Sequence, residues 1–267
     1  MERIHTQSVW RFEDNRFLEK EDVIATEYPI TVKVNGNELL TIVCTPEFIE
    51  DMVVGFLISE RIIVKYEDIT EIRMDESMGI VHIETTRSFP FFEQLHSKRY
   101  ITSCCGMSRQ GFVFANDVLT AKQMNTKNVI LAPEDCFSLM EKMNSNADLF
   151  MQTGGVHIAA LCDTTAFTLT RMDIGRHNAL DKIYGHCLKN AIPVNDKVIV
   201  FSGRISSEIL LKVAKIGCEI VLSKSAPTEL AINLAHELGI TAVGFIRENS
   251  FNIYSHPDRI SGAIQSF

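Results

Sequence analysis

Hydrophobic and polar residues alternate in short paired segments over the first hundred positions, which predicts a β-rich region. Two such stretches, 28–34 and 39–43, flank Asn35-Gly36, a dipeptide typical of tight hairpins because both turn residues need positive φ. Two more alternating stretches, 69–74 and 79–85, follow. This order, with one helix between the pairs, predicts a small α+β roll whose helix packs on its sheet.

The predicted helix follows Thr45-Pro46-Glu47, so we expect Thr45 to cap it and Pro46 to occupy its first position. Apolar residues recur after this point at helical spacing and indicate the buried side of the helix. They are Phe48, Met52, Val53, Phe56 and Leu57.

The pattern changes in the second part of the chain, where short apolar runs alternate with helical segments. The runs 197–201, 219–222 and 241–246 predict buried strands, and 206–216 and 228–238 predict helices that end at Gly217 and Gly239. Alternating strands and helices indicate a largely parallel sheet covered by helices. The polar and aromatic stretch 86–99 marks the expected boundary, so we predict two domains, 1–97 and 98–267.

Composition agrees with a globular protein. The 267 residues are 46% hydrophobic and 22% charged, which excludes a disordered chain. The net charge of −8 argues against broad binding to nucleic acid or to anionic membranes. No apolar run approaches the ~20 residues of a membrane span. The first residues lack the apolar stretch of a signal peptide, so we expect seven reduced cysteines in a cytoplasmic protein.

The first candidate site is a pair of adjacent cysteines, Cys104 and Cys105, followed by Gly106 in an expected loop. Nearby cations such as Arg99 and Arg109 lower the pKa of a thiol, which is ~8.5 in a free cysteine. An exposed thiolate on a loop suits covalent relay of an atom such as sulfur. The alternative is that both are small buried side chains. A metal site is disfavoured, because no second Cys or His pair has the spacing of a zinc finger.

A second candidate site contains Gly154, Gly155 and His157. Two glycines before a segment of small residues, which we expect to begin a helix, allow a ligand to approach the backbone and expose N–H groups to anions. His157 stands beside alanines, and the sequence leaves open whether it contacts a ligand or is a hydrogen-bonded core residue.

The third candidate is the polar segment 173–182, at the expected start of a helix. Asn178 is placed to cap that helix and Asp181 to favour its positive end. Three basic residues remain, and they suit a phosphate or carboxylate, although a solvated helix face explains them equally well. They are Arg176, His177 and Lys182.

Two strand-to-helix turns, 201–207 and 223–228, form the fourth candidate. In open α/β sheets ligands bind at the carboxyl ends of strands, and the glycine, serines and cations of these turns favour a nucleotide-like anion. Neither turn is a Walker loop or a G-x-G-x-x-G motif. The first contains Ser202, Gly203 and Arg204. A C-terminal strip is suited to stacking on a heterocycle, or it is an edge strand without a ligand; it consists of Phe251, Asn252, Ile253, Tyr254, Ser255 and His256.

Together, these motifs resemble the FdhD family of formate dehydrogenase accessory proteins. The resemblance extends from about Glu27 to Ile260, and the stretch 173–178 is too specific for chance. The matching motifs are Ser103-Cys104-Cys105-Gly106, Thr153-Gly154-Gly155-Val156-His157, Asp173-Ile174-Gly175-Arg176-His177-Asn178-Ala179, Ser202-Gly203-Arg204, Ser225-Ala226-Pro227 and Phe251-Asn252-Ile253-Tyr254.

The resemblance implies a cytoplasmic sulfurtransferase, or sulfur carrier, that takes sulfur from a cysteine desulfurase as a cysteine persulfide. It implies transfer to the molybdenum or tungsten bis(molybdopterin guanine dinucleotide) cofactor before insertion into formate dehydrogenase. It also implies a homodimer and a cytidine-deaminase-like three-layer α/β/α domain after the small roll. Cys105 is then the persulfide carrier. The glycine turns, Arg176, His177, Arg204 and the strip 251–256 then hold the pterin–guanine ligand, for which GDP is a mimic.

Two departures from known motifs limit this reading. The family often has C-G-x-C, whereas Ser108 occupies the second cysteine position here, so no disulfide can join 105 to 108. Zinc deaminases use H-x-E and P-C-x-x-C, but Ala159 stands where the glutamate belongs and the chain has no C-x-x-C. We therefore expect no zinc and no deaminase chemistry.

Two other function classes remain open on the residues alone. A non-catalytic chaperone of formate dehydrogenase would hold the cofactor, move no sulfur and tolerate loss of Cys105. A nucleotide-converting enzyme is disfavoured by the missing zinc ligands.

Overall fold

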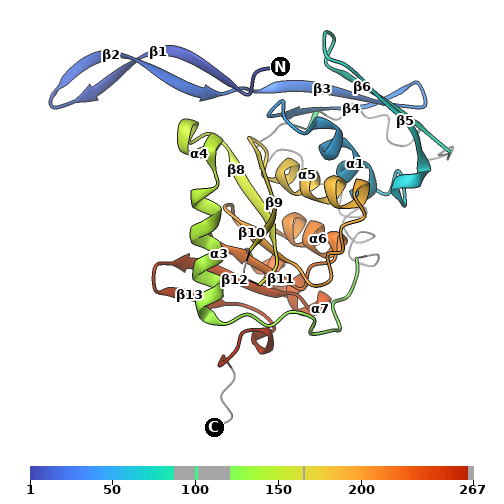
Figure 1. Ribbon diagram of the computed structural model, residues 1–267, viewed down its shortest axis with the longest axis vertical. Helices are drawn as coiled ribbons and strands as arrows, with labels where there is room; N and C mark the ends of the chain where they lie inside the picture. The colour runs from blue at the N-terminus through green and yellow to red at the C-terminus, as the bar shows by residue number, and fades with distance from the viewer. Residues whose placement is uncertain (87–99, 102–120, 165, 264–267) are drawn as a thin grey trace.

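The computed structural model of the chain describes residues 1–86, 100–101, 121–164 and 166–263. Its strands form three groups: a two-stranded hairpin, a five-stranded sheet and a six-stranded sheet. Figure 1 shows the hairpin extending sideways from the top of the molecule, with the two larger sheets below and beside it. None of the described helices combines the length and apolar character needed to span a bilayer.

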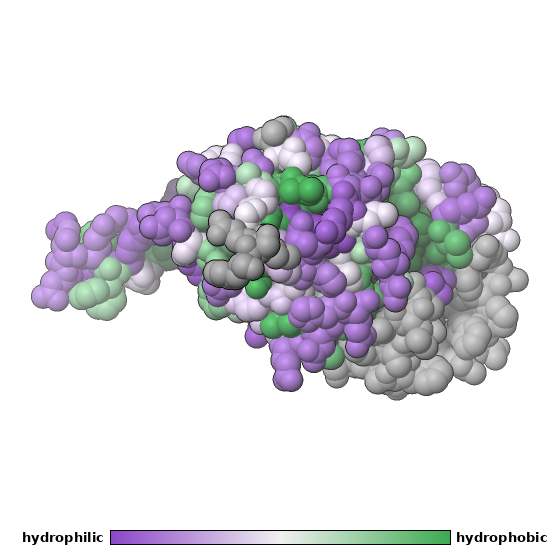
Figure 2. All heavy atoms as spheres, turned by 90° about the horizontal axis from the view of Figure 1, so that it is seen from below, coloured by the Kyte–Doolittle hydropathy of each residue, from purple (hydrophilic) through white to green (hydrophobic). Residues whose placement is uncertain are grey.

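The hairpin, here called the arm, was not expected from the sequence pattern. It consists of β1 (Ile4–Glu13) and β2 (Arg16–Ala25), which pair along their whole length. The arm projects from the body in both views (Figures 1 and 2). Trp10 is 71% exposed, and the rings of Phe12 and Phe17 contact each other near the tip with centroids 5.1 Å apart.

The five-stranded sheet confirms the predicted hairpin and the predicted second pair of strands. Its order is β5-β6-β3-β4-β7, and Asn35 and Gly36 have the positive φ that the β3–β4 turn requires. The sheet extends past the predicted boundary at residue 97, because β7 pairs with β4. The elements are β3 (Tyr28–Val34), β4 (Asn37–Cys44), α1 (Ile49–Ser59), a 3-10 turn (Tyr66–Asp68), β5 (Ile69–Asp75), β6 (Ile80–Thr85) and β7 (Tyr100–Ile101).

The predicted start of α1 was wrong. The helix begins at Ile49 after Phe48, whose φ is 53°, and Thr45 does not cap it. Thr45 instead accepts a hydrogen bond from the amide of Ile174, and its own amide donates to Asp173. A bond between distant segments has displaced the local cap that the sequence favoured. Phe48 also leaves the predicted apolar stripe, because it is 44% exposed.

The six-stranded sheet confirms the predicted strands and helices of the second part of the chain. β10, β11 and β12 are parallel, and β8, β9 and β13 complete the order β13-β12-β11-β10-β8-β9. The elements are α3 (Pro133–Ser145), α4 (Asp148–Thr153), β8 (His157–Cys162), β9 (Phe167–Asp173), α5 (Arg176–Lys189), β10 (Val198–Phe201), α6 (Ser207–Ile216), β11 (Ile220–Ser223), α7 (Glu229–Leu238), β12 (Thr241–Arg247), β13 (Ser250–Ile253) and a 3-10 turn (Pro257–Arg259).

α6 and α7 end at the two glycines that the sequence predicts, and each begins with a capping residue that was not predicted. Ser206 and Thr228 cap the two helices by accepting hydrogen bonds from the amides of Ile209 and Ala231. Gly217 and Gly239 end them in the left-handed conformation.

Helices cover both faces of this sheet. Leu139 and Met143 of α3 pack on one face, and α5, α6 and α7 pack on the other (Figure 1). The result is a mixed α/β fold with three layers. Its specific likeness to cytidine deaminases stays a prediction.

The helix predicted after Gly155 was wrong, since β8 begins at His157. Residues 158–162 are a continuous buried apolar run in the interior of the sheet. Periodicity alone does not separate a short buried strand from a helix segment.

The two sheets are joined through α5. Its residues Ala179 and Ile183 belong to the core under the six-stranded sheet, whereas Tyr184 and Leu188 also pack against the core that contains α1. The helices cross at Gly55 and Gly185. A Cβ on Gly55 would overlap the carbonyl of Asp181, and one on Gly185 would overlap the carbonyl of Asp51. Close backbone contact therefore sets the distance between the helices.

We expect Gly185→Ala to destabilise the fold by about 1–3 kcal/mol, because an added methyl group must push two packed backbones apart. Thermal unfolding followed by circular dichroism measures the change. Gly155→Ala is the matched control, since a Cβ there would meet no atom nearer than the Ala25 side chain at 3.4 Å, which is an ordinary van der Waals contact. Equal unfolding temperatures for the two variants would contradict this account of the crossing.

Candidate functional site

Four of the predicted segments meet at one edge of the six-stranded sheet. β10, β11 and β12 are parallel, so their carboxyl ends lie together. β8 runs antiparallel to β10 and pairs Ala159 with Phe201, which places His157 beside the turn after β10. β9 ends at Asp173, opposite His157, and α5 begins three residues later. Strand direction therefore gathers segments that are distant in the sequence.

Gly203 allows the turn after β10 to lie against His157. The imidazole of His157 stacks on the ring of Phe201 with centroids 6.5 Å apart. A Cβ on Gly203 would lie 3.0 Å from that ring and 3.3 Å from Nδ1 of His157. The amides of Gly203 and Arg204 donate to no acceptor among the residues that the structure describes. Two N–H groups beside a histidine suit an anion.

Positive charge collects at the same place. Nε of Arg176 is buried, and no hydrogen-bond acceptor for it exists within the described part of the chain. Nε2 of His177 lies 3.0 Å from the carboxylate of Glu208. Burial, and then the charge of Arg176, lower the pKa of His157 below its ordinary 6.5. A buried donor without a partner favours an anionic ligand, and the effect of Arg176 on the pKa of His157 shows that its positive charge acts at this point.

The serines of the two turns bond within the protein. The hydroxyl oxygen of Ser202 accepts from the amide of Ile158 at 2.9 Å, and the hydroxyl of Ser225 donates to the carbonyl of Ser202 at 3.2 Å. Ser223 donates to the carbonyl of Gly203 at 2.7 Å. These bonds fix the turns against each other, so the backbone amides are better placed than the hydroxyls to bind an anion.

The interpretation of Lys182 as part of an anion site was wrong. Its ammonium group lies 2.7 Å from Asp173, and both side chains are fully buried. It also donates to the carbonyls of Thr45 and Met172, each at 3.1 Å. Lys182 thus neutralises an internal carboxylate and connects β9 to the segment after β4.

Asn178 and Asp181 are not capping residues either, because Gly175 precedes the first turn of α5. The Asn178 amide donates to the carbonyl of Val43 and to Asp173. Asp181 accepts from Ser59 at 3.1 Å and pairs with Lys212. Of the predicted polar cluster, the structure leaves only Arg176 and His177 at the candidate site.

Gly154 and Gly155 end α4 and lie beside the base of the arm. The amide of Gly154 donates to Phe150, and its φ of 62° gives the turn out of the helix. A Cβ on Gly155 would meet Ala25 of β2. Their amides do not begin a helix, so they are not the helical N–H donors that the sequence suggested.

The residues of the strip 251–256 do not lie together. Those up to residue 254 alternate between the two faces of the sheet, and the last two lie at the edge opposite the candidate site. Phe251 packs on Phe137 of α3 with ring centroids 5.4 Å apart, and Ile253 joins the same core. Asn252 is exposed and donates to the hydroxyl of Tyr254, whose ring packs over Gly244. Asn252 and Tyr254 therefore share a face with α7.

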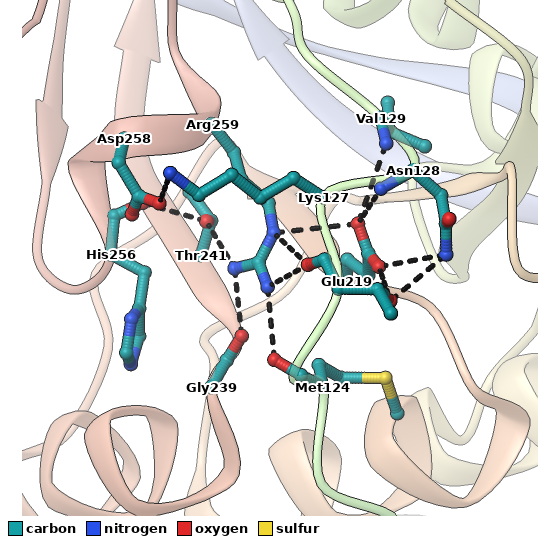
Figure 3. Close-up of polar contacts among 11 residues, drawn as sticks. Met124, Lys127, Asn128, Val129, Glu219, Gly239, Thr241, His256, Asp258 and Arg259 are labelled. Atoms are coloured by element: carbon teal, nitrogen blue, oxygen red, sulfur yellow. Dashed lines mark hydrogen bonds and ion pairs between the residues drawn. The ribbon is translucent and has the colours of Figure 1, made fainter.

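Ser255 and His256 lie at the opposite edge of the sheet. The Ser255 hydroxyl donates to the carbonyl of Ile240, and the Thr241 hydroxyl donates to the carbonyl of His256. Figure 3 shows His256 beside a cluster in which the guanidinium of Arg259 pairs with Glu219 and donates to the carbonyls of Gly239 and Met124. This cluster ties the C-terminal segment to the body and is separate from the candidate site.

Sequence analysis missed Phe245, Lys224 and Arg247 at the carboxyl edge. Phe245 is 42% exposed with a φ of 53°. Arg247 donates to the carbonyl of Lys224 at 2.6 Å, and its guanidinium lies 5.9 Å from the centroid of the Phe245 ring. The sequence Gly244-Phe245-Ile246-Arg247 resembles an ordinary buried strand, and only the observed bulge reveals the exposed ring.

The described cysteines are all buried. Burial raises the pKa of the Cys44 and Cys136 thiols to about 12 and that of Cys187 to about 11, and it also raises the pKa of Cys162 and Cys218. Buried thiols with high pKa values are poor nucleophiles. Cys104 and Cys105 lie outside the described residues.

We expect Lys182→Met to cost about 3–5 kcal/mol, because it leaves Asp173 as an uncompensated buried charge. Chemical denaturation measures the loss. Arg176→Met is the matched control and should change the free energy of unfolding by less than about 1 kcal/mol. If Lys182→Met kept full stability, the role of the buried pair would be disproved.

The low pKa of His157 predicts a measurable response to charge. The unfolded chain binds this proton at higher pH than the folded chain, so the histidine contributes stability that is lost as pH falls below 6.5. Arg176→Gln removes a repelling charge and should raise the pKa of His157 in an NMR titration. Pyrophosphate should do the same in the wild type. An unchanged pKa in both cases would show that no anion site exists there.

Comparisons with known proteins agree with the motifs. The model of the FdhD/NarQ family matches residues 25–261, so it begins where the arm ends. The chain is 53% identical over 256 residues to the sulfur carrier protein FdhD of Shouchella clausii, covering 96% of each chain. It is 53% identical over 254 residues to that of Bacillus subtilis, covering 95% of this chain and 96% of the other.

A solved structure shows the same fold. It is a proposed formate dehydrogenase accessory protein from Desulfotalea psychrophila, with a TM-score of 0.77 at 23% identity. The match covers 96% of this chain and 99% of the other. The family model matches most of the sequence, and the identity to these relatives is high. The chain therefore belongs to the FdhD/NarQ family.

Proposed function

We propose that this protein carries sulfur for the maturation of formate dehydrogenase, with Cys105 as the persulfide-bearing residue. Its relatives at 53% identity are named sulfur carrier proteins. The assignment of the persulfide to Cys105 rests on one observation: all five described cysteines are buried. Because their thiols are inaccessible and have raised pKa values, the sulfur belongs on Cys104 or Cys105, and Cys105 matches the cysteine of the family motif.

The loading step needs no oxidant. The Cys105 thiolate attacks the outer sulfur of a persulfide on a cysteine desulfurase. The S–S bond of the donor breaks, a new S–S bond forms on Cys105, and the donor cysteine leaves as a thiolate. A thiolate at neutral pH is the only chemical requirement on this chain.

The cargo that best suits the carboxyl edge is a large anion with planar rings. We propose the bis(molybdopterin guanine dinucleotide) form of the molybdenum cofactor as that substrate. The amides of Gly203 and Arg204, with Arg176, are placed to bind phosphate oxygens. His177 and His157 lie beside them and offer further hydrogen bonds. Binding carrier and acceptor on one protein makes the transfer local.

The test is intact-protein mass spectrometry after incubation with a cysteine desulfurase and cysteine. We expect the wild type to gain one sulfur atom that is lost on reduction, and Cys105→Ala to gain none. Cys187→Ala is the matched control at a buried thiol and should load normally, as should Cys104→Ala.

Loss of loading only in Cys104→Ala would move the carrier residue by one position. No gain in the wild type, with a desulfurase shown to be active, would overturn sulfur transfer and leave a cofactor-holding chaperone.

A further inference from the structure

The large aromatic side chains of the arm lie on one of its two faces. Directly paired residues of an antiparallel ribbon project to the same side, as do alternate residues along each strand. Phe12 pairs with Phe17, and Trp10 stands two positions before Phe12. The three rings therefore share one face, and they are 71%, 59% and 68% exposed for Trp10, Phe12 and Phe17. They lie toward the tip, away from the body (Figures 1 and 2).

The two faces of the arm also differ in charge. Glu19 pairs with Trp10, and Glu21 follows two positions later, so both carboxylates share the face with the rings. We call this side the aromatic face; it contains Trp10, Phe12, Phe17, Glu19 and Glu21. The cations of the arm, Arg11, Arg16 and Lys20, all lie on the opposite face. Apolar rings flanked only by carboxylates complement an apolar groove with a basic rim.

The base of the arm is fixed beside the candidate site. Arg3, just before β1, pairs with Asp148 of α4 at 2.6 Å. Ala25, the last residue of β2, packs on the core of the six-stranded sheet and lies against Gly155. Gly155 is two residues before His157, which belongs to the candidate site. A molecule seated on the arm is therefore placed next to the carboxyl edge of the sheet.

The same features argue against other occupants of the aromatic face. Solvent alone is a poor one, because a lone two-stranded ribbon is marginally stable in water and clustered exposed rings mark interaction sites. Two copies of this face packed on each other would bring the Glu19 and Glu21 carboxylates of both together, which costs free energy. An anionic membrane would repel the same carboxylates. A basic surface on a different protein remains the complementary partner.

We propose that the aromatic face docks apo-formate dehydrogenase, the protein that receives the cargo in the function proposed above. The inference rests on that function for the identity of the partner. The rings enter an apolar groove of the dehydrogenase, and Glu19 and Glu21 pair with lysine or arginine side chains on its rim. Buried aromatic anchors within a polar rim carry most of the binding energy in many interfaces. Docking here keeps the receiver beside the carboxyl edge, which makes delivery of the cargo local.

The experiment measures binding of the full chain to purified apo-formate dehydrogenase by biolayer interferometry. Trp10→Ala should weaken binding about 30-fold or more, as expected for truncation of a central aromatic anchor. Val9→Ala is the matched control on the opposite face and should bind like the wild type. Both variants should unfold at the wild-type temperature, since Trp10 is largely exposed.

A charge reversal tests the predicted basic rim. Glu21→Lys and Asp22→Lys make the same change of charge at adjacent residues on opposite faces. Only Glu21→Lys should weaken binding, by about 5-fold or more, and added salt should reduce the difference. Equal affinities of the two variants would overturn the proposed charge complementarity.

Two further results would overturn the docking role. One is equal affinity of the dehydrogenase for Trp10→Ala and the wild type. The other is a smaller oligomer for Trp10→Ala than for the wild type in analytical ultracentrifugation, which would assign the aromatic face to self-association.

Failure of this inference is distinguishable from failure of the proposed function. If the wild type binds no apo-formate dehydrogenase, the docking role is overturned, and sulfur loading of Cys105 in the wild type decides separately whether the carrier function stands.

Discussion

The buried ion pair between Asp173 and Lys182 fixes the geometry on which the candidate site depends. Asp173 ends β9, and its carboxylate receives the amides of Thr45 and Gly175 as well as the Lys182 ammonium. These bonds determine where the chain leaves the sheet and where α5 begins. Arg176 and His177 follow in the first turn of that helix. Their position therefore depends on the Asp173–Lys182 ion pair, which is fully buried.

The candidate site has satisfied hydrogen bonds behind it and an unsatisfied hydrogen-bond donor facing it. Behind it, every polar group of the Asp173 network finds a partner inside the protein, as low dielectric surroundings demand. In front of it, Nε of Arg176 has no acceptor among the described residues, and burial together with the charge of Arg176 lowers the pKa of His157. A rigid, satisfied interior thus presents an unsatisfied, positively charged surface, which is the arrangement expected of a preorganised anion site.

Sequence analysis succeeded where local chemistry decides the structure. Asn35-Gly36 and the helices that end at Gly217 and Gly239 depend on neighbours in sequence, and each formed as predicted. It failed where a distant partner decides. Lys182 looked like a ligand-binding cation because Asp173 lies nine positions away and the burial of both was not visible. His157 and Gly203 were chosen separately, and only the antiparallel direction of β8 brings them together.

The position of α5 between the two sheets also bears on how the protein emerges from the ribosome. The glycine surface of α1 is complete once residue 59 has been made, but the helix that covers it ends at Lys189. At ~5–20 residues per second, synthesis of the intervening segment takes on the order of ten seconds. During that interval α1 lacks the helix that covers its glycine surface, so the N-terminal part of the nascent chain exposes this surface until α5 has been made.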